Sequence, residues 1–207
     1  MSASQIALKR YYRFHARIYN LTRWSFLFGR TALIREVALR TRPRAILEVG
    51  CGTGYQLKRL IRWFPEARVT GVDLSGEMLR RARRCVGHHP GLRLIEGAYD
   101  RPLSGDRPFD LILFSYTLSM INPGWERVLE VAEEDLGPGG LLAVVDFHKS
   151  PLTAFSRWMA VNHVRMEGHL LAELSRGWQP VHLRVRHAYG GLWRYVTFIG
   201  RKAEGRR

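Results

Sequence analysis

Apolar positions recur at helical spacing at the start of the chain and in short continuous runs further on. Residues 5–19 and 24–41 carry Leu, Ile, Tyr and Phe at helical spacing and contain neither Gly nor Pro apart from Gly29. Both segments are predicted to be helices. From residue 44 onward, short apolar runs alternate with amphipathic segments, which indicates strands followed by helices.

This alternation predicts the fold class. The expected strands are 44–50, 68–74, 92–97, 109–116 and 140–147, and the expected helices between them are 54–65, 76–86 and 124–136. Residues 151–177 are predicted to be a helical insertion. Two alternating runs within 181–202 meet at Gly190 and Gly191, which is typical of an antiparallel hairpin. We therefore expect an α/β protein with a Rossmann-like, mostly parallel seven-stranded sheet and an antiparallel last strand.

Length and composition indicate one such domain. The chain has 207 residues, 46% of them apolar, which is enough for one full core. We divide it into N-terminal helices at 1–43 and an α/β domain at 44–207. Cys51 and Cys85 fall within predicted core elements and show no paired spacing, so free thiols and a cytoplasmic location are expected. No secretory leader and no run of about 18 apolar residues is present, so any membrane contact should be peripheral.

Positive charge is concentrated in the N-terminal segment. The chain has a formal net charge of +15, which favours nucleic acid, anionic lipid or acidic protein as a partner without choosing among them. A helix with cations beside aromatic rings suits the plane of an anionic bilayer. The residues expected to contact the membrane are Lys9, Arg10, Arg13, Arg17 and Trp24. The same helices are expected to form a lid over a ligand site, with different faces serving the two roles. The alternative is that the aromatic side chains only pack on the sheet and cover that site, while the arginines are merely solvated.

A glycine-rich turn marks the candidate ligand site. The stretch LEVGCGTG places Gly50, Gly52 and Gly54 after a buried strand and before a helix. Glycine lets the chain turn sharply and lets a ligand approach the backbone. Asp73 ends the next strand, where an acidic residue accepts the ribose hydroxyls of a bound nucleoside. The spacing is shorter than the dinucleotide fingerprint, so pyrophosphate binding is the weaker interpretation; a plain strand turn with a helix cap is the structural alternative.

Four stretches, LEVGCGTG, GVDLSGEML, FDLILFSYTLSM and LGPGGLLAVVDF, resemble the class I S-adenosylmethionine-dependent methyltransferases over residues 44–148. The resemblance implies S-adenosylmethionine as cofactor. It implies cofactor contacts from Glu48, Gly50, Cys51, Gly52, Gly54, Asp73, Leu74, Met78, Ala98, Tyr99, Ser115 and Tyr116. Ala98 stands where this family usually has an Asp that meets the adenine, and Tyr99 or Asp100 is expected to replace that contact.

Methyl transfer needs an aligned acceptor and, for an amine, a group that takes a proton. The candidates are Tyr116, Asp146 and His148 at the carboxyl edge of the sheet. The alternatives are that Tyr116 belongs to the core and that Asp146 caps a loop. The remaining histidines lack metal-ligand spacing, so no metal is expected.

The acceptor is inferred from a narrower resemblance. SYTLSM does not fit the strand end of nucleic-acid amino-group methyltransferases, so a nucleic acid partner is not expected. HARIYNLTRWSFLFGRTALI, SYTLSMI and VVDFHKS resemble small bacterial lipid N-methyltransferases. That resemblance implies successive methylation of phosphatidylethanolamine or diacylglycerylhomoserine at the inner face of the cell membrane. It also places Tyr19 over the cofactor, as a further candidate to act on the amine. Arg30 is expected to bind the carboxylate of the cofactor or a lipid phosphate. The alternatives are a soluble small-molecule acceptor or a catalytically silent basic binding protein. No obligate protein partner is inferred.

Overall fold

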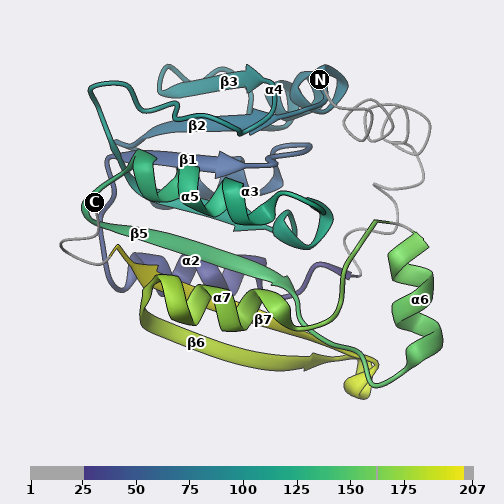
Figure 1. The fold of residues 1–207 in the computed structure, drawn as a ribbon. Helices are drawn as coiled ribbons and strands as arrows, with labels where there is room; N and C mark the ends of the chain where they lie inside the picture. Colours follow the sequence, from purple (N-terminus) through teal and green to yellow (C-terminus); the bar gives the residue numbers. More distant parts are fainter. Residues whose placement is uncertain (1–25, 162, 203–207) are drawn as a thin grey trace.

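A sheet of seven strands in the order β3-β2-β1-β4-β5-β7-β6 forms the centre of the computed structural model (Figure 1). The structure describes residues 26–161 and 163–202. The strands are β1 (Ala45–Val49), β2 (Arg68–Asp73), β3 (Leu92–Glu96), β4 (Phe109–Ser115), β5 (Leu136–Phe147), β6 (Gln179–Ala188) and β7 (Trp193–Arg201). The predicted helix at 5–19 lies outside the described residues.

Strand direction confirms the predicted fold class. Strands β1 to β5 pair in parallel, and β7 pairs antiparallel with both β5 and β6. The chain leaves β1 toward β2 and β3 on one side and returns to β4 on the other. The order of strands therefore reverses between β1 and β4, and open α/β sheets bind ligands beyond the carboxyl ends of the strands at such a point.

Helices cover both faces of this sheet (Figure 1). One face carries α2 (Arg30–Ala38), α3 (Tyr55–Trp63) and α4 (Gly76–Val86), and the other carries α5 (Trp125–Asp135) and α7 (His169–Gly177). Each helix buries one apolar stripe; α3 buries Leu57 and Leu60, while its charged residues face outward. Helix α6 (Thr153–Val161) lies off the carboxyl ends of the strands. Among the described residues, no helix has both the length and the apolar character needed to cross a bilayer.

Three elements differ from the prediction in their bounds. Helix α2 begins after Gly29, whose φ of 78° breaks the expected helix 24–41, and a Cβ there would lie 2.6 Å from Cε2 of Tyr195. Strand β5 begins at Leu136 because this residue pairs with Phe109 across an irregularity in the ladder. The insertion 151–177 contains two separate helices, α6 and α7. The first two differences involve contacts between segments far apart in the sequence.

A buried carboxylate holds the loop after β3 to α5. Asp135 is fully buried and accepts hydrogen bonds from the Tyr99 hydroxyl at 2.7 Å, the Leu103 N–H at 2.8 Å and the Ser104 N–H at 2.7 Å. Removing the carboxylate would leave the buried Tyr99 hydroxyl and the half-buried N–H groups of Leu103 and Ser104 without this acceptor. The loop beside the carboxyl end of β3 therefore depends on this side chain.

Asp135→Ala should lower the free energy of unfolding by roughly 3 kcal/mol, because several donors lose one charged acceptor. Urea unfolding of both proteins measures the difference. Glu134→Ala is the matched control, since Glu134 is exposed and its pairing with Arg127 is expected to contribute less than about 1 kcal/mol. Equal effects of the two substitutions would contradict this role of Asp135.

Candidate functional site

The turn between β1 and α3 needs glycine at several positions. Gly50, Gly52 and Gly54 have φ angles of 68°, 53° and 80°. A Cβ at Gly50 would lie 2.6 Å from Cγ2 of Thr117 in the loop after β4, and one at Gly54 would lie 2.9 Å from Cα of Ala82 in α4. The turn is thus packed between two neighbouring segments while its backbone remains at the carboxyl edge of the sheet.

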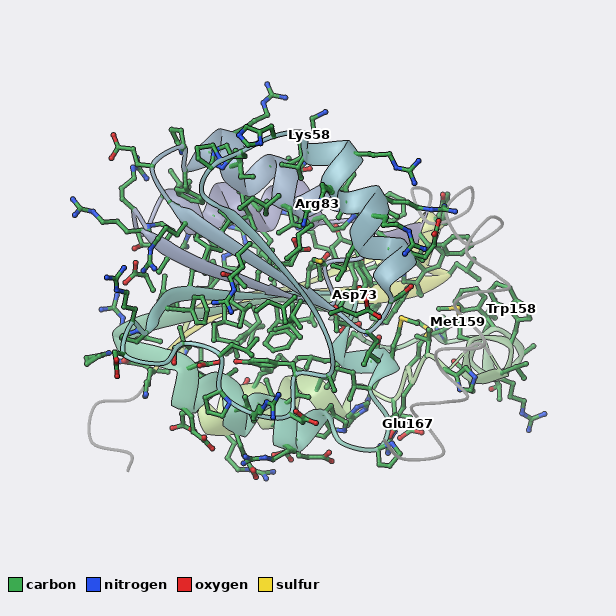
Figure 2. All side chains as sticks on the ribbon, turned by 90° about the horizontal axis from the view of Figure 1, so that it is seen from above. Lys58, Asp73, Arg83, Trp158, Met159 and Glu167 are labelled. Carbon is green, nitrogen blue, oxygen red and sulfur yellow. The ribbon has the colours of Figure 1, made fainter. Side chains whose placement is uncertain are left out.

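Asp73 connects this turn to the start of α4. Its Oδ2 accepts from the Gly52 N–H at 2.8 Å and its Oδ1 accepts from the Ser75 N–H at 2.9 Å. The Ser75 hydroxyl in turn accepts from the Met78 N–H at 3.3 Å and caps α4. A carboxylate has about four acceptor positions, so binding these backbone groups is compatible with accepting ribose hydroxyls. Figure 2 shows Asp73 at the end of the sheet that is nearer to Met159 and Trp158 of α6.

The surroundings of the turn are anionic. Burial raises the pKa of the Cys51 thiol well above its usual range, and the charges of Glu48 and Asp73 raise it further. Glu48 is buried near the end of β1. A negative potential attracts the sulfonium and ammonium groups of S-adenosylmethionine and repels the pyrophosphate of a dinucleotide. The residues present therefore fit the cofactor that the sequence predicts.

The other predicted adenine-side residues surround the start of α4 and the end of β3. Met78 is buried, and Leu74 and Ala98 are half-buried. The Tyr99 hydroxyl donates to Asp135, so it is directed toward α5. Of the two side chains expected to replace the usual adenine contact, the exposed Asp100 is the one whose polar group is not held by α5.

Tyr116 connects the end of β4 to the segment that enters α2. It has a left-handed φ of 56° and is 1% exposed. Its hydroxyl donates to the Phe28 carbonyl at 2.8 Å, and its ring packs edge-on against Phe147. Burial holds the pKa of this phenol well above its usual range, so it stays protonated at neutral pH. Ser115, directly before it, is also buried, and its carbonyl accepts from the Thr117 hydroxyl at 3.3 Å.

Asp146 lies fully buried near the end of β5. Its carboxylate accepts from the Ser119 N–H at 3.1 Å and the Phe147 N–H at 2.8 Å. Burial raises its pKa to about 6 although these hydrogen bonds oppose the shift. The bond to Ser119 ties this carboxylate to the segment after β4, as expected from the interpretation in which Asp146 caps a loop.

His148 follows β5 and is half-buried in a cationic setting. The backbone N–H of His148 donates to the Arg194 carbonyl at 2.9 Å, and the backbone N–H of Arg194 donates to the Lys149 carbonyl at 2.7 Å. Burial lowers the pKa of His148, and the charges of Lys149 and Arg194 lower it further. The imidazole is therefore neutral at pH 7.

Arg30 lies against the first turn of α3. Its guanidinium carbon lies 3.8 Å from the centroid of the Tyr55 ring, and that of Arg59 lies 3.5 Å from the same centroid. The Gln56 amide donates to the Arg30 carbonyl at 3.1 Å. Tyr55, Gln56 and Arg59 were not predicted as site residues, although their position just after the glycine turn was a usable signal.

An aromatic cluster at the same edge was also not predicted as part of the site. Trp193 is fully buried, and its ring stacks on Phe26 at 5.1 Å and on Phe155 at 5.5 Å between centroids. Trp193 begins β7 beyond the pairing of Tyr195 with Phe147, which places it at the carboxyl end of β5. The described residues thus provide an apolar wall next to His148.

Several predicted residues lie outside the described part of the chain. They are Lys9, Arg10, Arg13, Arg17, Tyr19 and Trp24. Within the described residues, no group of three or more His, Cys, Asp or Glu side chains is arranged to hold a metal ion.

Asp73→Ala should weaken binding of S-adenosylhomocysteine about a hundredfold. The reason is that one carboxylate accepts the hydrogen bond from the glycine turn and is also expected to accept those of the ribose hydroxyls. Isothermal titration calorimetry measures this, with circular dichroism to check folding. Asp106→Ala, which removes an exposed carboxylate, is the control. Binding by Asp73→Ala and by Asp73→Asn as tight as the wild type would contradict the assignment.

The raised pKa of Asp146 predicts a specific pH dependence. An aspartate in the unfolded chain titrates near 3.9, so between about pH 4 and pH 6 the native state binds more protons than the unfolded state. The stability that this group contributes is present below that range and is lost as the pH rises through about 6. Asp146→Asn should therefore gain up to about 3 kcal/mol relative to wild type across this range. Urea unfolding measures it, and a pH-independent difference would contradict it.

Comparison with known proteins identifies the central part of the chain. Residues 46–140 match a family model described as a methyltransferase domain. The chain is 33% identical over 108 residues to malonyl-(acyl-carrier protein) O-methyltransferase from Halalkalibacterium halodurans, covering 51% of this chain and 40% of that protein. It is 40% identical over 122 residues to trans-aconitate 2-methyltransferase from Deinococcus radiodurans, covering 58% and 45%. The chain spans less than half the length of these relatives.

Solved structures share the fold. The N-methyltransferase NodS from Bradyrhizobium japonicum WM9, in complex with S-adenosylhomocysteine, superposes with a TM-score of 0.68 at 20% identity. This likeness covers 84% of this chain and 86% of that one. Together with the family match and the glycine turn, it agrees with the cofactor expected from the sequence. Residues 46–140 therefore match a methyltransferase domain, within a chain that shares the fold of that N-methyltransferase.

Proposed function

We propose that this protein transfers a methyl group from S-adenosylmethionine to the carboxylate of a small organic acid. The observation that carries the proposal is the cationic setting of His148 at the carboxyl edge, where Lys149 and Arg194 are close enough to lower its pKa. The same charges attract a carboxylate and repel a protonated amine. The relatives named for malonyl-(acyl-carrier protein) and trans-aconitate support an acid as acceptor.

A carboxylate acceptor also fits the state of the predicted bases. Its oxygen is already deprotonated at pH 7 and needs no group to take a proton. The two predicted bases are already engaged in other hydrogen bonds. The Tyr116 hydroxyl donates to the Phe28 carbonyl, and the Asp146 carboxylate accepts from two backbone N–H groups. Both residues then act as positioning residues.

The chain's own contribution is alignment and exclusion of water. When bound, S-adenosylmethionine supplies a methyl group already activated by the positive sulfur. In this proposal Asp73 holds the ribose, and Arg30 beside Tyr55 holds the carboxylate of the methionine part. The aromatic cluster around Trp193 keeps water away from the acceptor, and neutral His148 contacts it.

A lipid amino head group at the membrane surface is the second candidate. The observation that favours it is the set of exposed apolar residues on and before α6, namely Leu152 at 52%, Trp158 at 54% and Val161 at 78% exposure, beside the exposed Arg157. Such a surface suits an anionic bilayer. It ranks second because a protonated amine would have to approach Lys149 and Arg194.

Radiolabelled S-adenosylmethionine tests the choice of acceptor. Purified protein is incubated with trans-aconitate, with malonyl-coenzyme A and with vesicles that contain phosphatidylethanolamine. A methyl ester releases methanol in base, whereas an N-methylated amine does not. Base-labile label on an acid is expected; base-stable label found only in the vesicles would overturn the proposal in favour of the lipid.

His148→Gln tests whether a base is needed. Because a carboxylate gives up no proton, kcat on the acid should fall by less than about tenfold and stay flat between about pH 6 and 8. Removal of a true general base costs about 10²–10⁴ in rate. Steady-state kinetics across this range measure the effect, and a loss of that size would show that the acceptor must be deprotonated.

A further inference from the structure

Charge is distributed unevenly between the two helical faces of the sheet. Helices α3 and α4 together contain seven Lys and Arg residues and one acidic residue, Glu77. Helix α5, on the opposite face, contains five acidic residues and one Arg. The described part of this basic protein therefore presents one strongly positive helical face and one negative helix.

The positive charges lie on adjacent outer surfaces. The helices pack closely, since a Cβ at Gly54 would lie 2.9 Å from Cα of Ala82. Their apolar residues face the sheet, which leaves the charged ones outside. We define the basic face as the exposed residues Lys58, Arg62, Arg80, Arg83 and Arg84. Figure 2 shows Lys58 and Arg83 on the same side of the molecule, away from Glu167.

Most of these charges have no acidic partner in the described part of the chain. Glu77 pairs with Arg80 at 2.6 Å and with Arg81 at 3.0 Å. No carboxylate within residues 26–161 and 163–202 forms an ion pair with Lys58, Arg83 or Arg84. Like charges at neighbouring helical positions repel one another, and an anionic surface placed against them removes that repulsion.

An exposed aromatic residue adjoins the basic face. Trp63 ends α3 beside Arg62 and is 46% exposed. Trp and Arg are the residue types that most often contribute strongly to protein interfaces. An exposed ring within a positive surface therefore suits a partner that offers carboxylates around an apolar contact.

We propose that the basic face docks an acidic helical protein that carries the acid acceptor. The docking proposal rests on the proposed function, because the docked protein would supply the carboxylate acceptor in carrier-bound form. Arg80, Arg83 and Arg84 recur at helical spacing and match carboxylates along one helix of a partner. Helix α4 begins beside Asp73 and carries Arg83 and Arg84 in its last turn, so the basic face extends along this helix away from the cofactor turn. The acidic α5 on the other face opposes wrapping by a long polyanion such as nucleic acid.

Fluorescence anisotropy with labelled apo-acyl carrier protein tests the docking. Arg83→Glu/Arg84→Glu should weaken binding by about tenfold or more, and added salt should weaken it further. Arg127→Glu/Arg176→Glu changes the charge by the same amount on the opposite face and should leave binding nearly unchanged. Equal effects of the two double variants, no binding by the wild type, or tighter binding of a short DNA duplex at the same residues would overturn the proposal.

Kinetics separate this proposal from the proposed function. The Arg83→Glu/Arg84→Glu variant should lose about tenfold or more in kcat/KM on malonyl-acyl carrier protein and little on free trans-aconitate or malonyl-coenzyme A. If free acids are methylated and the variant keeps full activity on the carrier-bound acid, docking fails while the function stands. If no acid is methylated, the function fails, and the anisotropy experiment still decides the docking.

Discussion

The carboxylate of Asp73 is the contact on which the site depends. It binds the Gly52 N–H in the turn after β1 and the Ser75 N–H at the start of α4. The parallel register that pairs Val49 with Val72 brings these two strand ends together. One side chain therefore fixes both backbone segments that border the cofactor, and it does so with charge-assisted hydrogen bonds.

The segment 26–30, which leads into α2, is held against this centre by two further contacts. The Tyr116 hydroxyl binds the Phe28 carbonyl, and the Gln56 amide binds the Arg30 carbonyl. Tyr116 adopts a left-handed backbone that costs about 1–3 kcal/mol in a non-glycine residue. The buried hydrogen bond and the packing on Phe147 offset that cost. The segment that enters α2 thus joins the cofactor side of the site to the aromatic side.

The sequence was sufficient for the fold and for the glycine turn. Short apolar runs and glycines carry those signals locally, and the strands, Gly50 and Asp73 lie where the pattern predicted them. The sequence could not reveal which polar side chains are already held in hydrogen bonds to distant parts of the chain. The Tyr99 hydroxyl binds Asp135 across a separation of 36 residues in the sequence. The Asp146 carboxylate binds the segment after β4 across a separation of 27 residues.

The choice of acceptor depended on the same kind of long-range contact. Arg194 reaches His148 only because β7 returns beside β5, so the cationic setting has no local sequence signature. The prediction of a lipid amine relied in part on the N-terminal pattern, most of which lies outside the described residues. The charge around His148 instead favours an acid.

A crystal structure with S-adenosylhomocysteine tests the central claim most directly. Both ribose hydroxyls are expected to bind the Asp73 carboxylate, and the sulfur is expected to face His148 and Trp193. A nucleoside bound away from Asp73, or a sulfur directed away from His148, would contradict it.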